Sequence, residues 1–390
     1  MNAETQKRIY ISCAPGLEPG LIRECQALDI ERDKTKPKSD PAIDLTSGED
    51  KGGIEFDGSD AQIYQCNLYL RTASRVVVRL GEFYAAAFSE LRKKASRLEW
   101  ELYLHPAQPV DVKVTCHKSR LYHSDAVAER VKGAIEDRLQ KAPQEADKNK
   151  PAQIILVRLV NDLCTISIDS SGELLYKRGY RQAIAKAPLR ETLAAGLLLA
   201  SNWQTNSPLV DPFCGSGTIP IEGAMMARHI APGITRHFAF MDWPTYQKEL
   251  NQVFLDQARK EIQPTEQFFY GSDRDQGAIE MAKANASRTG VNGNIHFACH
   301  AISDLPHFDN PGSIVTNPPY GMRITSSKDL RNLYASFGKL LRASYQGWQV
   351  GILCSEDALI AALDLGPAAK TIHLTNGGIP VKFSIFTISK

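Results

Sequence analysis

The sequence has no long apolar run and no paired cysteine motif, and both absences exclude classes of protein. It contains no stretch of about 18 consecutive apolar residues, so we expect no membrane-spanning helix. The eight cysteines are scattered without a C-x-x-C pair, which argues against a zinc ribbon or a thioredoxin-like site. The N-terminal stretch MNAETQKRIYISC lacks the apolar core of a signal peptide. We therefore expect a protein of the reducing cytoplasm.

A metal site is not indicated by the histidines either. His117, His123, His296, His300 and His307 have spacings that fit no common zinc site. We expect these side chains to be structural or to lie on the surface, and we expect no metal cofactor.

The sequence also lacks a strong net charge, because 46 Lys and Arg residues nearly balance 44 Asp and Glu residues. A total of +2 neither requires nor excludes a nucleic-acid partner, since a local basic patch matters more than the sum. Two basic clusters occur, within 71–97 and 177–190; each alone could be a solvated surface, but together they favour a polyanionic partner. The residues expected to contact it are Arg92, Lys93, Lys94, Lys118, Arg120, Lys177, Arg178, Arg181 and Arg323.

The length of 390 residues predicts two or three domains, and the first part of the chain mixes strands and helices. The tract 29–51, rich in charged residues, proline and serine, predicts an exposed loop or an irregular hairpin. The mixture of strands and helices in the first part of the chain is typical of a small α+β unit, and a linker follows this unit. Strands are expected at 8–13, 53–56, 75–80, 110–115, 154–160 and 163–168, and helices at 17–28, 61–70, 88–98 and 124–139.

The pattern changes near residue 180 to a regular alternation of strands and helices. Such alternation predicts an α/β domain with a mostly parallel sheet and helices on both faces. Strands are expected at 208–211, 268–272, 294–298, 313–316, 349–354 and 382–389, and helices at 189–200, 218–227, 276–289 and 329–341.

The first chemical motif is D-P-F-C-G-S-G-T, which runs from Asp211 to Thr218 between a strand and a helix. Gly215 and Gly217 allow a tight turn and a close approach of the backbone to a ligand. The helix start suits a carboxylate, whereas an acid before the glycines would repel a pyrophosphate. The motif therefore favours a ligand with an amine beside a carboxylate, such as the methionyl end of S-adenosylmethionine. The residues expected to bind it are Asp211, Phe213, Cys214, Gly215, Gly217 and Thr218.

The second motif is G-S-D-R-D, which ends the next strand. A carboxylate at this place can accept hydrogen bonds from both hydroxyls of a ribose. We expect Asp273 to do so because it lies closest to the strand end. The alternative role for an acid here is to cap the following helix, which Asp275 could fill.

The third motif is N-P-P-Y, from Asn317 to Tyr320, after an apolar strand. The exocyclic amine of a base is a poor nucleophile because its lone pair is delocalised into the ring. Two acceptors, the Asn317 side-chain oxygen and the Pro318 carbonyl, can localise that lone pair, and Pro318 and Pro319 fix the backbone. Tyr320 can stack on an extruded base. The motif thus predicts catalysis by placement and electrostatics rather than by a strong base.

In this order the motifs resemble those of class I methyltransferases, and more narrowly the THUMP-domain RNA guanine-N2 methyltransferases. The segments Asp211–Ala224 and Val315–Gly321, the latter followed by Met322 and Arg323, are similar to that family's cofactor and catalytic loops. Residues 175–181 and 187–193 are similar to its junction into the catalytic domain, 110–135 to its THUMP core and 52–56 to its ferredoxin-like companion.

The resemblance implies four regions and an activity. The regions are a ferredoxin-like subdomain at 1–72, a THUMP RNA-binding domain at 73–172, a linker at 173–187 and a Rossmann-like class I methyltransferase domain at 188–390. The implied cofactor is S-adenosyl-L-methionine, and the implied reaction is methylation of the exocyclic N2 amine of a guanine in RNA. The expected target is 23S rRNA in bacterial relatives and tRNA in others.

One stretch departs from the family's pattern. Many relatives carry an acid after the third strand, beside the cofactor's adenine amine, but here that place falls near His300 or Ala301. The nearest acid is Asp304, so adenine recognition by Asp304 is a hypothesis. Cys214 is expected to pack rather than react, because direct transfer to an amine needs no covalent intermediate.

Three other functions stay open at this point. A DNA adenine-N6 methyltransferase also uses N-P-P-Y, although the upstream region resembles an RNA-binding module. A non-catalytic ribosome assembly factor could keep an inactive methyltransferase fold, but the intact segment from Asn317 to Tyr320 argues against it. A nicotinamide-dependent dehydrogenase would need a fuller glycine fingerprint.

Overall fold

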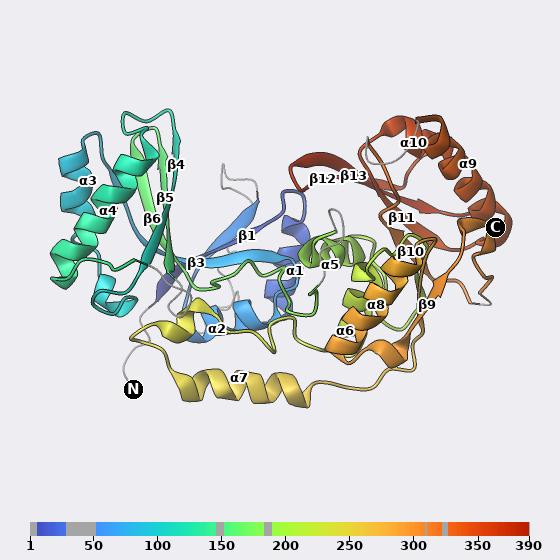
Figure 1. Cartoon of the computed structure of the whole chain (residues 1–390), viewed down its shortest axis with the longest axis horizontal. Coiled ribbons are helices and arrows are strands. Elements are labelled where there is room, and N and C mark those ends of the chain that lie inside the picture. Colours follow the sequence, from blue (N-terminus) through green and yellow to red (C-terminus); the bar gives the residue numbers. More distant parts are fainter. Residues whose placement is uncertain are drawn as a thin grey trace, which may run out of the picture.

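The strands of the computed structural model form two sheets, one in each half of the chain (Figure 1). The structure describes residues 6–28, 52–145, 152–182, 189–308, 310–321 and 327–389. The predicted loop at 29–51, the end of the predicted linker and Arg323 lie outside these ranges. In the part of the chain that is described, no helix has both the length and the apolar character needed to cross a membrane.

The N-terminal half is built on one six-stranded sheet of the described residues. Its elements are β1 (Lys7–Cys13), α1 (Glu18–Ala27), β2 (Gly53–Gly58), α2 (Asp60–Tyr69), β3 (Ala73–Tyr84), α3 (Phe88–Ala95), β4 (Val110–His117), α4 (Ser124–Leu139), β5 (Gln153–Val160) and β6 (Leu163–Asp169). The strand order is β2-β1-β3-β6-β5-β4, and β4 with β5 is the parallel pair. The predicted ferredoxin-like and THUMP regions therefore share a sheet.

Strand β3 carries this sheet from one region into the other. Its first part pairs with β1 and its second part with β6. The register shifts between Arg79 and Gly81, and a Cβ on Gly81 would lie 2.6 Å from Cδ2 of Leu98. A bulge of this kind bends and twists a strand. As a result β4, β5 and β6 stand across the direction of β1 and β3 in Figure 1.

The C-terminal half is an open sheet with helices on both faces, as the alternating pattern predicts. Its helices are α5 (Glu191–Ala200), α6 (Thr218–Ala227), α7 (Lys248–Lys260), α8 (Gln276–Thr289), α9 (Ser327–Ser344) and α10 (Asp357–Ala362). Its strands are β7 (Leu209–Asp211), β8 (Phe269–Asp273), β9 (Ile295–Cys299), β10 (Ser313–Thr316), β11 (Gln349–Cys354), β12 (Lys370–Asn376) and β13 (Ile379–Thr387). The order is β12-β13-β11-β10-β7-β8-β9, with β13 antiparallel to both of its neighbours.

Helix α7, which the sequence pattern did not predict, lies along α2 of the N-terminal half (Figure 1). Leu68, Ala231 and Ala258 form a small buried cluster between them. The segment before α7 adds a ring stack between Tyr64 and Phe240, with centroids 4.3 Å apart. This segment of the C-terminal half therefore packs the two halves against each other.

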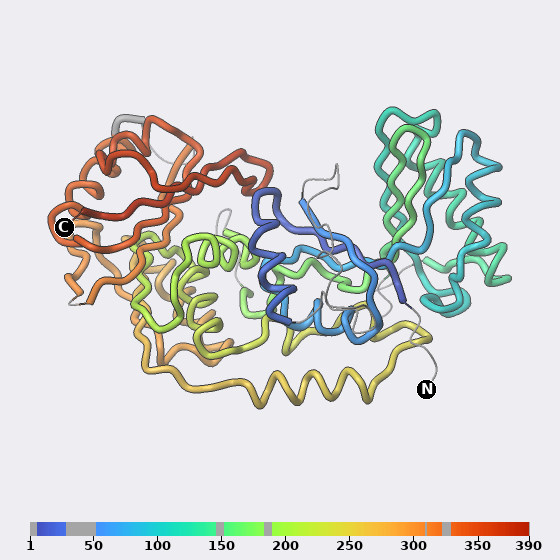
Figure 2. Tube along the Cα trace, turned by 180° about the vertical axis from the view of Figure 1, so that it is seen from behind, coloured from blue at the N-terminus to red at the C-terminus, as the bar shows by residue number. Residues whose placement is uncertain are grey.

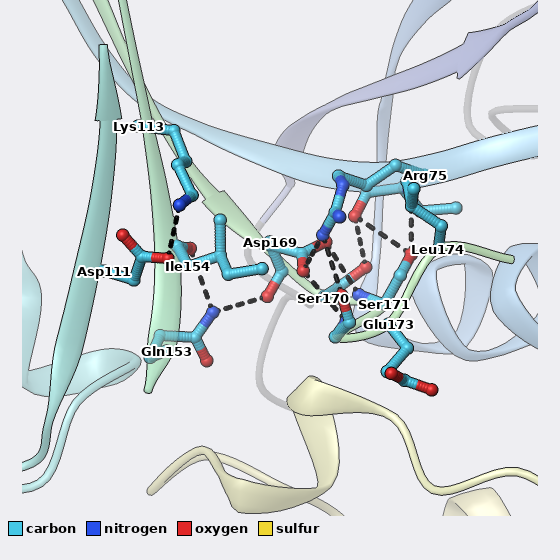
Figure 3. A network of polar contacts seen from close by, with 12 residues as sticks. Arg75, Asp111, Lys113, Gln153, Ile154, Asp169, Ser170, Ser171, Glu173 and Leu174 are labelled. Carbon is cyan, nitrogen blue, oxygen red and sulfur yellow. Dashed lines mark hydrogen bonds and ion pairs between the residues drawn. The ribbon is translucent and has the colours of Figure 1, made fainter. Parts of the chain in front are cut away.

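A buried polar network holds the end of β6 where the two halves meet (Figure 3). Asp169 pairs with Arg75 and accepts hydrogen bonds from the N–H groups of Ser171, at 3.0 Å, and Gly172, at 2.9 Å. Burial raises the pKa of the Asp169 carboxyl to about 6, against the opposing effect of Arg75. The network orients the chain as it leaves the N-terminal sheet for the linker.

Candidate active site

The carboxyl ends of β7, β8 and β10 bring the three sequence motifs together. Strand β7 lies between β8 and β10, so the direction of connection reverses there, and ligands bind at such a switch point in open α/β sheets. Asp273 Oδ2 accepts a hydrogen bond of 3.0 Å from Gly215 N, which joins the second motif to the first. Asp211 Oδ1 accepts one of 2.6 Å from Thr316 Oγ1, directly before Asn317.

The first motif forms a tight loop that opens α6. Gly215 and Gly217 have positive φ angles of 50° and 83°, a conformation that favours glycine. A Cβ on Gly217 would come within 3.0 Å of Ala282 and Phe297, whereas one on Gly215 would meet nothing within 4 Å. The backbone at Gly215 is therefore open to a ligand, and the start of α6 offers free N–H groups to it.

The remaining loop residues face the interior. The Phe213 ring packs edge-on against Phe337, with centroids 5.4 Å apart. Cys214 is buried, and burial raises the pKa of its thiol well above the usual value, which suits a packing role. Thr218 is buried and accepts a hydrogen bond of 2.7 Å from Nη2 of Arg181.

Asp211 is a buried carboxyl at the base of the site. Besides the bond from Thr316, its Oδ1 accepts a hydrogen bond of 3.2 Å from Phe213 N. Burial raises the pKa of Asp211 to about 7, and the nearby Asp273 carboxylate adds to the rise. A positive charge placed nearby would stabilise the ionised form and lower that pKa.

The two acids of the second motif have different roles. Asp273, at the end of β8, uses Oδ2 to hold Gly215 N and Oδ1 to hold Asp275 N, at 3.0 Å each. Asp275 caps α8 and accepts a hydrogen bond of 2.9 Å from Gly277 N. The capping role considered for an acid in this motif thus belongs to Asp275, and Asp273 lies against the cofactor loop.

Residues outside the motifs hold the loop in place. Asn285 Nδ2 donates to Ser216 O at 3.1 Å, and Arg288 Nη1 donates to Asn285 Oδ1 at 2.8 Å. Arg181, from the linker, bonds to Thr218 as described. The sequence motifs did not indicate Asn285 or Arg288, because both lie on α8 and reach the loop only through the fold.

The segment from Asn317 to Tyr320, predicted to be catalytic, and the adjoining Gly321 make hydrogen bonds with three other parts of the fold. Tyr334 Oη of α9 donates to the Pro319 carbonyl at 3.3 Å. Glu356 Oε1, beyond β11, accepts from Gly321 N at 2.9 Å. Asn376 Nδ2 of β12 donates to Tyr320 Oη at 3.0 Å. None of these supporting residues was found by sequence reasoning, since no local motif marks them.

Asn317 has the feature most informative for function. Its side-chain oxygen is buried and has no hydrogen-bond partner among the described residues. A buried acceptor without a partner costs free energy of about 1–3 kcal/mol. Such an atom at the end of a parallel strand suits a ligand that brings the missing donor. Pro318, the other predicted acceptor residue, is buried beside it.

Asp304 lies apart from these contacts. It ends a short 3₁₀ helix (Ile302–Asp304), is exposed, and accepts a hydrogen bond of 3.1 Å from Ser303 Oγ. The position at which relatives carry the adenine-binding acid is nearer His300. The backbone N–H of His300 donates to the backbone carbonyl of Asp273 at 3.1 Å. In the described residues no contact joins Asp304 to the cofactor loop.

Two of the basic residues predicted to contact RNA are corrected by the structure. Arg178 is buried; its guanidinium donates to the carbonyls of Leu175, at 2.7 Å, and Arg71, at 2.6 Å, and lies 3.6 Å from Glu222. Arg181 is largely buried beside Glu191, at 3.1 Å. Both guanidinium groups are turned inward to hold the junction of the two halves, so neither is available to a phosphate.

The other predicted RNA contacts lie on the surface of the N-terminal half and the linker. Lys93, Lys118 and Arg120 are exposed, and Arg120 lies 3.6 Å from Asp162. The partly exposed or exposed side chains already paired with an acid are Arg92 with Asp137, Lys94 with Glu90 and Lys177 with Glu173. Arg323 lies outside the described residues. Among the residues that are described, no group of three or more His, Cys, Asp or Glu side chains could hold a metal ion.

Family comparisons match the three regions of the chain. A methyltransferase domain described as RMKL-like matches residues 178–385. A THUMP domain matches residues 85–169, and an RlmL ferredoxin-like domain matches residues 42–77.

Two curated relatives resemble almost the whole chain. The Synechocystis protein slr0064, provisionally named an RNA methyltransferase, is 31% identical over 96% of this chain and 95% of its own length. A protein of Syntrophotalea carbinolica named ribosomal RNA large subunit methyltransferase K/L is 32% identical over 98% of this chain. That match covers 54% of the relative, so the chain spans about half of its length.

Solved structures share the arrangement of both halves. The crystal structure of SMU.472, described as a methyltransferase complexed with SAH, is 29% identical and has a TM-score of 0.88, with 100% of both chains covered. A Listeria monocytogenes protein named as an N6-adenine-specific DNA methylase is 31% identical and has a TM-score of 0.85. That match covers 98% of this chain and 97% of the Listeria chain.

Proposed function

This chain belongs to the RMKL-like methyltransferase family that carries a THUMP domain, and on that premise we propose that it methylates the exocyclic N2 amine of a guanine in RNA. The observation that carries the proposal is the buried side-chain oxygen of Asn317, which lacks a partner among the described residues. It lies in the segment that follows β10, beside the strand that leads into the cofactor loop. An amine brought to this place would supply the missing donor.

The residues of the cofactor loop suit S-adenosylmethionine. The buried Asp211 carboxyl, with its raised pKa, gains stability from a nearby cationic amine. The free N–H groups at the start of α6 suit the carboxylate of a methionyl group. Asp273 at the end of β8 suits the hydroxyls of a ribose. When bound, the cofactor supplies an electrophilic methyl group.

The catalytic segment prepares the amine for attack. Asn317 Oδ1 and the Pro318 carbonyl accept the two amine hydrogens, which draws the lone pair out of the ring. Pro318 and Pro319 hold these acceptors rigidly because proline restricts the backbone. Tyr320 stacks on the ring of the base, a contact worth about 1–3 kcal/mol. The rate enhancement then comes from orientation and from charge placed in advance.

The N-terminal half supplies the RNA contacts. Lys93, Lys118 and Arg120 are exposed cations of the part that matches the THUMP domain. Contacts of this kind to phosphates position a nucleic acid without reading its sequence. A guanine in structured RNA must leave its stack to reach Asn317. The name of the Syntrophotalea relative supports large-subunit (23S) rRNA as the substrate, and tRNA is the second choice.

A specific observation favours one alternative. The Listeria structure, similar over nearly the whole chain, is named as a DNA methylase acting on the N6 amine of adenine. Asn317 and Pro318 would serve that amine by the same pair of hydrogen bonds. The N-terminal THUMP match supports RNA over DNA.

A competition between two methyl-group acceptors, rRNA and DNA, tests the proposal. The protein is incubated with methyl-labelled S-adenosylmethionine and equal amounts of unmodified rRNA and duplex DNA, each separately and then together. We expect label in rRNA, reduced little by the DNA. Label confined to the DNA would overturn the proposal in favour of the adenine alternative.

A further inference from the structure

The tyrosine of the catalytic segment is held by a residue far along the chain. Asn376 Nδ2 donates a hydrogen bond of 3.0 Å to Tyr320 Oη, across 56 residues of sequence. Tyr320 also packs against both large buried clusters of the molecule. The Tyr320 side chain is thus held by packing and by a bond at its far oxygen.

Asn376 occupies a rigid place. It is the last residue of β12 and pairs with Ile379, the first residue of β13. The two residues between them, Gly377 and Gly378, have positive φ angles of 59° and 85°. A two-residue turn with this conformation matches the twist of the strands and fixes the register of a hairpin. The Asn376 amide is therefore presented from a defined point.

The same hairpin touches the N-terminal half. A Cβ on Gly16, which precedes α1, would lie 2.3 Å from His373 O and 3.0 Å from Cδ2 of Leu374. Leu374 is buried at this contact. Figure 2 shows the β12–β13 hairpin reaching back to the first strand and helix of the chain. The hairpin thus bridges the half that carries the THUMP match and the catalytic segment.

We propose that Asn376 is a positioning residue that fixes the phenol end of Tyr320 for the target base, and that the β12–β13 hairpin forms a wall of the base pocket. This inference rests on the proposed function for the identity of the base. Without this bond the phenol end of Tyr320 could shift when no base is present, and each misplacement lowers the fraction of productive encounters. The bond from Asn376 restricts the phenol end in advance.

The test compares three variants on the hairpin. Asn376→Ala removes the donor, and Asn376→Asp restores a bond because its carboxylate accepts the Tyr320 hydroxyl proton. Thr375→Ala is the matched control, since Thr375 is the exposed neighbour on the same strand. We expect Asn376→Ala to lower kcat/KM for RNA about tenfold, with cofactor affinity and Tm unchanged, and Asn376→Asp to recover most of the loss. Equal activity of Asn376→Ala and Thr375→Ala would overturn the inference, as would a Tm loss that Asn376→Asp does not recover.

A second measurement does not depend on the substrate. In protein labelled with ¹³C-tyrosine, the ring signals of Tyr320 are those lost in Tyr320→Phe. We expect these signals to shift in Asn376→Ala but not in Thr375→Ala. Unchanged signals would overturn the inference. If the wild-type protein methylates no RNA, the proposed function fails, and these signals still decide whether Asn376 fixes the phenol end of Tyr320.

Discussion

Thr316 donates a hydrogen bond of 2.6 Å to the carboxylate of Asp211, and this bond joins the strand of the catalytic segment to the strand of the cofactor loop. Both residues are buried, with 0% and 2% of their surfaces exposed. The two functional loops are thereby fixed at adjacent strand ends.

Removing that bond should loosen both loops. In Thr316→Val the buried Asp211 carboxyl loses its hydroxyl donor, which costs about 1–3 kcal/mol of unfolding free energy. We expect urea denaturation to show this loss, and calorimetry to show weaker binding of S-adenosylmethionine. Thr316→Ser, which keeps the hydroxyl, is the control and should lose only about 1 kcal/mol, for the buried methyl group that it removes. Equal stability of the valine and serine variants would contradict the role of the bond.

The side-chain oxygen of Asn317 should matter for turnover but not for cofactor binding. Asn317→Ala removes one of the two acceptors for the amine, and we expect kcat to fall at least about a hundredfold, the size typical of a lost electrostatic contact. The cofactor dissociation constant should stay within about twofold of wild type. The two are measured by label transfer to RNA and by calorimetry. Retained turnover would refute the assignment, and a joint loss of both would indicate misfolding.

The raised pKa of Asp211 predicts how the ligand-free protein responds to pH. Burial raises that pKa from 3.8 to about 7, and Glu191 shows a rise to about 7 for the same reason. A raised native pKa contributes stability that is full below the unfolded value and is lost as pH rises through the native value. We therefore expect the Tm contribution of these carboxyls to decline between about pH 4 and pH 7. Asp211→Asn should remove the Asp211 part of that decline.

Cofactor affinity should change in the opposite direction. A cationic amine beside Asp211 binds its ionised form, so binding releases a proton. With a pKa of about 7 in the free protein, the affinity should rise about tenfold from pH 6 to pH 8. Calorimetry in buffers of different ionisation enthalpy measures both the affinity and the released proton. A flat profile in the wild-type protein, equal to that of Asp211→Asn, would show that Asp211 does not meet the amine.

Substitution of the neighbouring linker residues Arg178 and Lys177 should have different effects on stability and on RNA binding. Arg178 is buried beside Glu222, with 2% and 0% of their side chains exposed, so Arg178→Ala leaves a buried carboxyl without its partner. We expect that variant to lose about 3–5 kcal/mol of stability. Lys177 is exposed, and Lys177→Ala should leave Tm unchanged while reducing the salt slope of RNA binding by about one. Denaturation and filter binding at several salt concentrations separate the two, and similar effects of both variants would contradict the assignment.

The hypothesis that Asp304 recognises adenine has a direct test. Asp304→Ala should weaken cofactor affinity if its carboxylate meets the adenine amine. The side chain is exposed and bonded to Ser303, so its removal should leave Tm unchanged. Unchanged affinity in calorimetry would reject the hypothesis.

Sequence patterns predicted the elements that have strong periodicity of their own. The helices at Ser124–Leu139 and Thr218–Ala227 have the predicted limits. The first has a regular apolar face, and the second begins directly after a glycine turn. The three motifs could be expected to lie together because each follows a strand of one parallel sheet. The alternation of strands and helices in the sequence predicts such a sheet, and the proximity of the motifs follows from it.

The remaining features depend on contacts between distant segments. The sequence does not show whether a basic side chain is buried or exposed. The burial of Arg178 and the exposure of its neighbour Lys177 could therefore not be predicted. Helix α7 packs on α2, and β12 pairs with β13. The sequence pattern predicted neither element, because both depend on contacts with another segment. Asn376 reaches Tyr320 because a hairpin turns back, and no local pattern records that approach.

Nucleoside mass spectrometry identifies the methylated nucleoside directly. Unmodified rRNA and tRNA pools are incubated separately with the protein and labelled S-adenosylmethionine, then digested. We expect labelled N2-methylguanosine from the rRNA pool, and none when Asn317→Ala replaces the wild-type protein. Labelled N6-methyladenosine, or no label in either pool from protein that still binds the cofactor, would contradict this expectation.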